Sequence, residues 1–213
     1  VYKRQVQVLC RLENGGFGTG HNTVLSLLHS RVHFILNPDI QLTADTLSDL
    51  ADWMAAHPGV VMTRPGLTFP DGKPQQLPLR RCNVRAMVYR QLPCLRFWAK
   101  YNDRYLMADK DLTKPTEIEF CTGSFSAVDT AAFKAVGGFD EGYFMYVEDA
   151  DLTQKVLQKG TVWLAPQFAA IHAWHRAPMR DAGKFKMQLV SMGRYFNCLL
   201  YTSPSPRDGA TSR

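Results

Sequence analysis

The chain has 213 residues, of which 46% are hydrophobic and 21% charged, and its net charge is +6. This apolar content excludes a disordered chain, because enough surface can be buried to offset the conformational entropy lost on folding. No window approaches the roughly 20 apolar residues that a membrane-spanning helix needs, so no such span is predicted. The five cysteines are odd in number and have no paired spacing, which disfavours a disulfide framework or a zinc site.

The two ends of the chain are predicted to lie outside the fold, as the translation of a sequencing adapter. Residues 1–5 can be encoded by GTGTATAAGAGACAG, and the reverse complement of that DNA, read one base in, encodes the Cys-Leu-Leu-Tyr-Thr that starts at Cys198. The predicted domain therefore spans residues 6–197, and residues 198–213 are excluded from it; a natural disordered tail is the alternative. Without the four basic residues and one acidic residue of these ends, the net charge falls to +3. We therefore expect no nucleic-acid partner.

Between the ends, strand and helix patterns alternate along the chain. Short apolar runs predict strands at residues 6–10, 32–36, 60–62, 119–128 and 161–165. Helical apolar spacing and capping residues predict helices at residues 21–28, 43–56, 84–92, 129–136, 148–159 and 179–197. Residues 64–105 are rich in Pro and Arg and weakly periodic, so they are predicted to form a long excursion. The alternation predicts an α/β fold with a mostly parallel sheet.

The first candidate for chemistry is Asn37-Pro38-Asp39, which follows the predicted strand 32–36. In an open α/β sheet the carboxyl ends of the strands form the ligand crevice. One carboxylate there, together with phosphate oxygens of a substrate, suits a hard divalent cation. The alternative is an Asx-type turn that simply ends the strand.

The second candidate is the acidic opening of the predicted helix 148–159, where Glu148, Asp149 and Asp151 follow a run of aromatic residues. A carboxylate beside an aromatic wall loses water, which raises its pKa and suits a general base. The alternative is structural, because carboxylates also stabilise the amino end of a helix through its dipole.

Other residues have the same two interpretations. A tight turn at Gly137-Gly138 is followed by Phe139, Asp140 and Glu141, which could face a polar substrate or serve the turn alone. Gly123 interrupts a strand pattern, often a sign of close approach by a ligand. His172 follows a predicted strand and could bind a metal, although a lone histidine is more often structural.

Taken together and in this order, these segments resemble glycosyltransferase family 2, and in particular its bacterial rhamnosyltransferase-like branch. The resemblance extends over residues 6–197, and its most specific part is the block from Val136 to Leu152. The segments that carry it are Asn14–Asn22, Leu36–Asp39, Gly123, Val136–Leu152 and His172.

The resemblance implies a GT-A-type fold, in which a Rossmann-like, mostly parallel sheet flanked by helices is joined to an acceptor-binding part. Family members begin with strands that hold the nucleoside, and no such strands precede Val6. We therefore expect a partial domain that lacks its first strand or strands. By itself, this polypeptide is expected to fold poorly and to transfer no sugar.

The resemblance also implies roles for single residues. Asp39 corresponds to the last acid of the metal-binding motif, where Asn37 replaces the first acid, and His172 adds a second ligand for Mg²⁺ or Mn²⁺. Asp149 corresponds to the general base that deprotonates the acceptor. The residues expected to line the substrate are Asn14, Gly18, Asn22, Gly123, Phe139, Asp140, Glu141 and Glu148.

The implied reaction is transfer of a sugar with inversion, in the cytoplasm or at the inner face of the cell membrane. The donor is expected to be a nucleotide sugar, dTDP-rhamnose first and a UDP-sugar second, and the acceptor a cell-surface polysaccharide or lipid-linked glycan. The basic residues of the predicted helix 179–197 also leave a peripheral membrane contact open. Two alternatives remain: a non-catalytic glycan-binding homologue of the same fold, and a metal-dependent phosphoester hydrolase.

Overall fold

A computed structural model describes residues 7–92, 94–173 and 182–202. In chain order, its strands are β1 (Val32–Leu36), β2 (Ile40–Gln41), β3 (Val60–Thr68), β4 (Thr116–Ile118), β5 (Phe125–Asp129) and β6 (Thr161–His172). Its α-helices are α1 (Phe17–Asn22), α2 (Thr46–Ala56), α3 (Val84–Gln91), α4 (Ala99–Tyr105), α5 (Thr130–Ala135), α6 (Glu148–Val156) and α7 (Ala182–Thr202). Two short 3₁₀ helices are η2 (Leu25–Leu27) and η3 (Arg96–Trp98).

Side chains at helix starts explain why several predicted helices form where they do. The carboxylates of Asp45 and Asp129 and the side-chain oxygen of Asn83 accept a backbone N–H from the first turns of α2, α5 and α3. Each bond satisfies a donor that the helix itself leaves open. The helices predicted at residues 43–56, 84–92 and 129–136 are therefore confirmed within a few residues.

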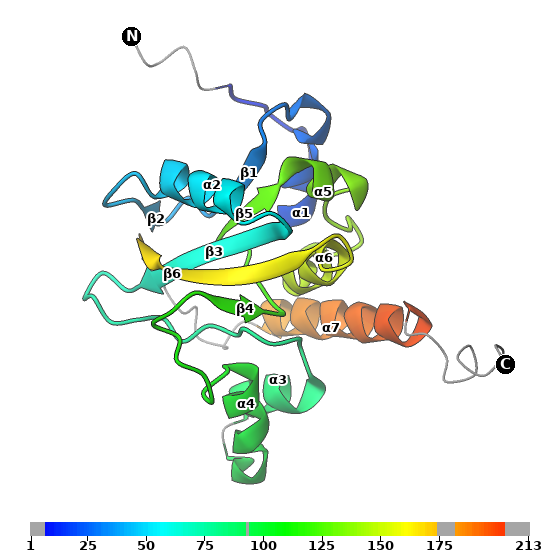
Figure 1. The fold of residues 1–213 in the computed structure, drawn as a ribbon. Coiled ribbons are helices and arrows are strands. Elements are labelled where there is room, and N and C mark those ends of the chain that lie inside the picture. Colours follow the sequence, from blue (N-terminus) through cyan, green and yellow to red (C-terminus); the bar gives the residue numbers. More distant parts are fainter. Residues whose placement is uncertain (1–6, 93, 174–181, 203–213) are drawn as a thin grey trace, which may run out of the picture.

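The sheet has the order β1-β5-β3-β6-β2, with β4 also paired to β6 (Figure 1). The α/β class is confirmed, but the expectation of mostly parallel pairing is wrong. Among the strands that the structure describes, only β3 and β6 pair in parallel. Strand β5 pairs antiparallel with β1 and β3, and β2 and β4 pair antiparallel with β6. The crossover helix α2 does make β1 and β3 run the same way. The later strand β5 lies between them and runs antiparallel to both. The alternation of strands and helices along the chain does not predict this insertion.

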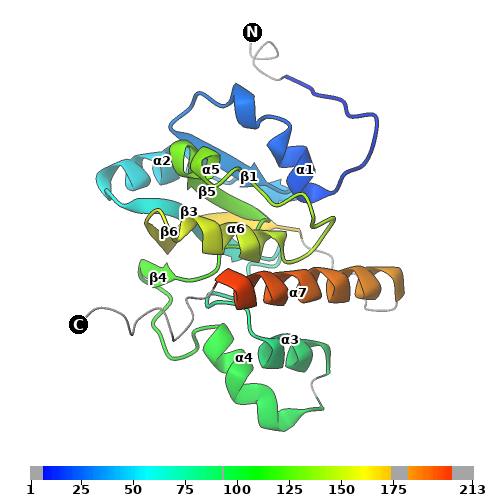
Figure 2. The ribbon, with the colours of Figure 1, turned by 90° about the vertical axis from the view of Figure 1, so that its right-hand side faces the viewer.

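Helices cover both faces of the sheet (Figure 2). Leu50 of α2 packs against one face, with Phe125 of β5 and Leu67 of β3. On the other face, Phe133 of α5 and Leu152 of α6 pack against the strands. The sheet is thus held between two apolar layers.

A smaller lobe of α3 and α4 lies at one end of the molecule, and α7 lies between this lobe and α6 in both views (Figures 1 and 2). Its apolar contact joins Met87 of α3, Tyr105 of α4, Ala150 of α6 and Tyr195 of α7. The long excursion predicted from its weak periodicity therefore contains two helices that pack onto α6. No helix in the described ranges is long and apolar enough to cross a membrane.

Several predicted elements differ from the structure. The helix predicted at residues 21–28 is wrong in its bounds, because α1 ends at Asn22 and only the short η2 follows, and the strands predicted at 60–62 and 161–165 extend to Thr68 and His172. The strand predicted at residues 6–10 is wrong for residues 7–10, where the chain forms no strand and Val8 is exposed. The strand predicted at 119–128 is irregular up to residue 124, because its peptide groups bond to neighbouring loops. The helix α7 begins at Ala182, so 179–181 lie outside the described residues, and it continues to Thr202 beyond the predicted domain end.

Candidate active site

Asp39 lies where the carboxyl ends of β1 and β6 approach each other. The amide of Asn37, one residue past β1, donates to the carbonyl of Ser124 at 2.9 Å. The amide of Ala173, one residue past β6, donates to the carbonyl of Asp39 at 3.1 Å. Since three segments close around this turn, its conformation is set by the sheet and not by the turn residues alone.

The structure brings Asp39 and His172, the two predicted metal ligands, together. His172 Nε2 lies 3.4 Å from Asp39 Oδ1. On the other side of the ring, His172 Nδ1 lies 3.0 Å from Gln75 Oε1, while Gln75 Nε2 donates to the carbonyls of His172 at 2.8 Å and Thr68 at 3.4 Å. Because the Gln75 amide nitrogen faces two carbonyls, its oxygen faces Nδ1 and fixes the proton there. The lone pair of Nε2 then points toward Asp39.

These groups fit a divalent cation. Asp39 Oδ1 is buried and has no hydrogen-bond partner among the described residues. Burial lowers the pKa of His172, partly opposed by the Asp39 charge, so the ring is neutral at pH 7. A neutral imidazole held through its other nitrogen is the form that ligates metals. Within the described ranges no group of three or more His, Cys, Asp or Glu side chains comes together. A cation here would therefore take its remaining ligands from a substrate or water.

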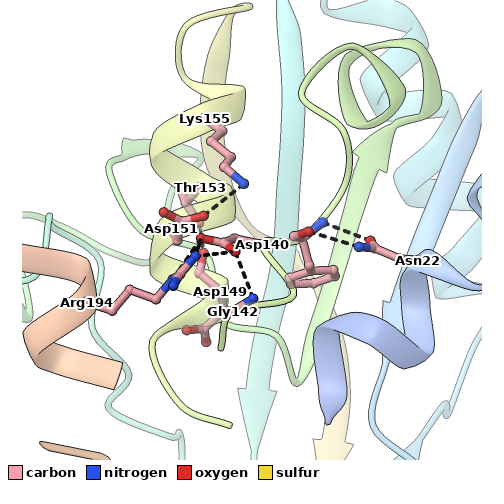
Figure 3. A network of polar contacts seen from close by, with 9 residues as sticks. Asn22, Asp140, Gly142, Asp149, Asp151, Thr153, Lys155 and Arg194 are labelled. Atoms are coloured by element: carbon pink, nitrogen blue, oxygen red, sulfur yellow. Dashed lines mark hydrogen bonds and ion pairs between the residues drawn. The ribbon is translucent and has the colours of Figure 1, made fainter. Parts of the chain in front are cut away.

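Asp149, the predicted base, lies half-buried in the first turn of α6 (Figure 3). Its Oδ2 accepts the amide of Gly123 at 3.0 Å, and its Oδ1 accepts the amide of Ala150 at 2.9 Å. Below it, the buried hydroxyl of Thr153 donates to the Asp149 carbonyl at 2.7 Å and accepts the amide of Cys121 at 3.2 Å. The carboxylate is thus held between α6 and the segment that leads into β5.

The backbone just before α6 is strained. Tyr146 and Val147 both have positive φ, 70° and 68°. A β-branched residue rarely adopts this conformation, which costs of order 1–3 kcal/mol and persists only where the surroundings enforce it. Such strain is concentrated at functional sites, and here it directs Glu148 and Asp149 into the fold.

Burial alters the protonation of this acidic pair. Desolvation raises the pKa of Asp149, partly opposed by its two backbone hydrogen bonds. Desolvation, and then the neighbouring Asp149 charge, raise the pKa of Glu148 to about 8, and Glu148 Oε2 is buried without a hydrogen-bond partner among the described residues. The pair shares its titration, so a proton remains on it near neutral pH. A carboxylate with a raised pKa is a better acceptor of a hydroxyl proton.

The raised pKa of Glu148 makes folding stability depend on pH. The protonated form is favoured in the fold, so its contribution is complete below the ordinary pKa of 4.5 and is lost as the pH rises through about 8. We expect Glu148→Gln to flatten the fall in unfolding free energy between pH 5 and 9 by more than ~1.4 kcal/mol, the equivalent of one pKa unit. Urea unfolding at several pH values measures this. Glu117→Gln, at an exposed glutamate of β4, is the control, and equal slopes in all three proteins would contradict the prediction.

Asp39 and Asp149 are both connected to the segment that leads into β5. Asn37, two residues before Asp39, bonds to Ser124, and the adjacent Gly123 bonds to Asp149. Two short contacts thus connect residues more than a hundred positions apart. The two acids therefore lie near the same short segment, Gly123 and Ser124.

The glycine-rich turn at residues 14–16 and the start of α1 pack against the loop that precedes α6. The amide of Phe17 donates to the carbonyl of Phe144 at 3.2 Å, and Gly16 has φ of +90° and would place a Cβ against that same carbonyl. Asn14 accepts the amide of Gly16 at 3.0 Å and shapes the turn. A Cβ at Gly123 would meet the Phe17 ring at 3.2 Å, so this turn lies beside Asp149.

Two glycines of α1 differ sharply in their surroundings. A Cβ at Gly18 would lie 2.7 Å from the Cβ of buried Phe139, whereas one at Gly20 would meet nothing within 4 Å. We expect Gly18→Ala to destabilise the fold by about 1–3 kcal/mol through overpacking. Gly20→Ala, the matched control, should be neutral or stabilising by up to ~1 kcal/mol, because alanine favours helix. Thermal unfolding of both variants measures the difference, and equal melting temperatures would refute this packing argument.

The predicted substrate residues of the 139–141 segment are held by contacts within the chain (Figure 3). Asn22 donates to the Phe139 carbonyl and accepts its amide, both at 2.9 Å, and donates to Glu141 at 3.0 Å. Arg194 of α7 forms a forked ion pair with Asp140 at 2.8–3.0 Å. These contacts give Asn22, Phe139, Asp140 and Glu141 a structural function, and their contact with substrate stays a prediction, as it does for Asn14 and Gly18.

Several residues of the site have no signal in the sequence. Gln75 lies in an aperiodic stretch, and Arg194 reads as one basic residue of an amphipathic helix. Phe17 and Thr153 have ordinary helical contexts. Only the folded chain shows that each of them holds a predicted site residue in place.

Comparison with known proteins supports the same assignment. No model of a known protein family matches the chain. The chain is 27% identical over 195 residues to the rhamnosyltransferase WbbL of Escherichia coli K12, covering 86% of this chain and 72% of that protein. It is 28% identical over 197 residues to an N-acetylglucosaminyl-diphospho-decaprenol L-rhamnosyltransferase of Mycobacterium tuberculosis, covering 83% of this chain and 61% of that protein.

Solved structures share the fold. GalNAc-T7, solved with UDP, GalNAc and Mn²⁺, matches with a TM-score of 0.57 at 16% identity, over 81% of this chain and 34% of its own. The mannosyltransferase PcManGT of Pyrobaculum calidifontis, solved with GDP-Man and Mn²⁺, matches with a TM-score of 0.56 at 16% identity, over 94% of this chain and 48% of its own. The predicted GT-A fold and the resemblance to rhamnosyltransferases are thereby confirmed.

Proposed function

We propose that this rhamnosyltransferase-like chain is the catalytic part of an inverting glycosyltransferase that uses a nucleotide-sugar donor and a divalent cation. The observation that carries the proposal is a set of contacts: Asp39 lies beside His172 in a turn that bonds to Ser124, and Asp149 bonds to the adjacent Gly123. A metal site for a diphosphate and a base for a hydroxyl are the two elements that sugar transfer from such a donor requires.

Asp39 and His172 would hold Mg²⁺ or Mn²⁺, with Gln75 fixing the imidazole. The bound ion would offset the negative charge that develops on the departing nucleoside diphosphate. Both solved neighbours contain Mn²⁺, which agrees with this assignment.

Asp149 would take the proton of the acceptor hydroxyl. As the acceptor oxygen bonds to the anomeric carbon, the bond from that carbon to the phosphate oxygen breaks, and the nucleoside diphosphate departs with the electron pair. A single displacement of this kind inverts the anomeric configuration. The amides of Gly123 and Ala150 orient the carboxylate for this step, and its raised pKa increases its proton affinity.

We further propose a rhamnose-like donor sugar and a lipid-linked acceptor at the inner face of the cell membrane. Both curated relatives are named rhamnosyltransferases, and the mycobacterial protein is named for a diphospho-decaprenol acceptor. A UDP-sugar is the second donor and a polysaccharide the second acceptor.

The test is sugar transfer by the full-length gene product, with dTDP-rhamnose and UDP-sugars offered in turn with Mn²⁺ and a lipid-diphosphate glycan. We expect a glycosylated acceptor whose new linkage has the opposite anomeric configuration to the donor, as measured by NMR. Release of free sugar or phosphate without transfer would favour a hydrolase instead. Binding without turnover would favour a glycan-binding homologue.

A further inference from the structure

A groove of about 490 Å³ opens between the α3–α4 lobe and the body of the fold. Its lining contains four arginines and a single carboxylate, that of Glu119, which accepts the backbone amide of Arg81 at 3.0 Å. The four arginines are Arg80, Arg81, Arg85 and Arg104. The groove is therefore strongly cationic, although the charge of the chain as a whole is only moderate.

The floor of this groove shares a buried cluster with the residue that follows Asp149. Cys82 and Tyr105 line the groove, and their side chains meet at 2.9 Å. The charge of Asp149 contributes to the raised pKa of both groups, after desolvation, so the carboxylate lies within electrostatic reach of them. Ala150, which follows Asp149, belongs to the same buried apolar cluster as Cys82 and Tyr105. A ligand in the groove would therefore extend toward the base.

The groove is separate from the proposed metal site. None of the residues that line it comes from the Asp39, His172 and Gln75 contacts. In an in-line displacement the attacking oxygen and the leaving phosphate lie on opposite sides of the anomeric carbon. A cationic site beside the base and away from the metal pair therefore belongs to the acceptor and not to the donor.

Two of the four arginines are held by contacts within the chain. Arg85 donates to the Tyr101 hydroxyl at 2.5 Å and stacks over that ring, with 4.7 Å between its guanidinium carbon and the ring centroid. Arg80 is paired with Asp109 at 2.9 Å, while Arg81 and Arg104 are exposed. A guanidinium bonds two phosphate oxygens at once, and a preorganised one loses less entropy in doing so. Four guanidinium groups lining one groove supply enough donors for more than one phosphate.

We propose that this arginine groove binds the diphosphate of a lipid-linked acceptor and holds the acceptor sugar over Asp149. The proposal rests on the proposed function and names the acceptor class of that same site. The same lobe exposes three apolar side chains: Val84, which lines the groove, and Leu92 and Phe97. Such residues on a basic lobe match the lipid part of the same ligand.

The test is binding of geranyl diphosphate to the full-length protein, measured by calorimetry in EDTA so that the metal site cannot hold the diphosphate. We expect the double variant Arg81→Gln, Arg85→Gln to weaken binding at least tenfold. Arg31→Gln, at an exposed arginine before β1, is the matched control and should bind like wild type. Inorganic pyrophosphate should bind more weakly than geranyl diphosphate, because it lacks the lipid part.

A kinetic comparison separates this proposal from the proposed function. With active enzyme, the double variant should raise the KM for a lipid-diphosphate acceptor at least tenfold and leave the donor KM unchanged. It should have no effect with an alkyl glycoside of the same sugar. Three results would overturn the groove assignment. The double variant could bind geranyl diphosphate like wild type, the Arg31→Gln control could lose as much affinity as the double variant, or a nucleoside diphosphate in EDTA could displace geranyl diphosphate. If the wild-type enzyme transferred no sugar to any acceptor, the proposed function itself would be refuted.

Discussion

Replacing Asp149 with asparagine is expected to lower the kcat of the full-length enzyme by about a thousandfold, within the 10²–10⁴ range of general-base catalysis. The amide cannot take a proton from the acceptor hydroxyl. It can keep one of the two backbone bonds from Gly123 and Ala150, and it removes a desolvated charge, so stability should change by no more than ~1 kcal/mol. Initial rates at saturating donor and acceptor, with thermal unfolding of the same samples, measure both effects.

Asp151→Asn is the matched control for this experiment. Asp151 lies on the same helix turn but pairs with Lys155 at 3.1 Å and does not contact Gly123. Loss of that pair should cost only ~0.3–0.5 kcal/mol and leave the rate within a few fold. A rate within tenfold of wild type for Asp149→Asn would remove the catalytic role and favour a glycan-binding module.

Replacing Asp39 with asparagine is expected to weaken Mn²⁺ binding by about 100-fold or more, because the pair loses its only formal negative charge. Gln75→Leu leaves both ligands in place but releases the histidine ring, so an intermediate loss of about 10–100-fold is expected. Electron paramagnetic resonance of Mn²⁺ titrations reports the affinity independently of turnover.

The exposed acid of α2 supplies the control for these variants, since Asp52→Asn changes the net charge by the same amount far from the ligands. It should bind Mn²⁺ like wild type. If Asp39→Asn bound Mn²⁺ as tightly as Asp52→Asn, the metal site would have to be assigned to other residues.

Local sequence pattern predicted the elements whose boundaries are set by capping and burial. Strand β1 and helix α5 form at the predicted residues because a β-branched run and the Asp129 cap act locally. The insertion of β5 between β1 and β3 was not predictable in this way, because it depends on pairings between segments more than sixty positions apart.

The candidate site shows the same division. The acids could be named as candidates because Asp39 follows a strand end and Asp149 opens a helix, although carboxylates at both positions also have structural uses. Their supports were not, because Gln75 and Thr153 acquire their roles only from carbonyl and amide groups brought to them by distant segments. The contacts of Asn22 with Phe139 and of Arg194 with Asp140 could not be predicted for the same reason.

The parallel pairing of β3 with β6 has a consequence for how the chain folds. Its register matches Val60 with Thr161, so the centre of the sheet joins residues about a hundred positions apart. Contacts of such high sequence separation are closed late and slowly, since the loop between them must first lose its freedom. During synthesis, the edge of β3 that pairs with β6 therefore stays unpaired until the last third of the chain has left the ribosome. The edge that carries both Asp39 and His172 is assembled only at that final step.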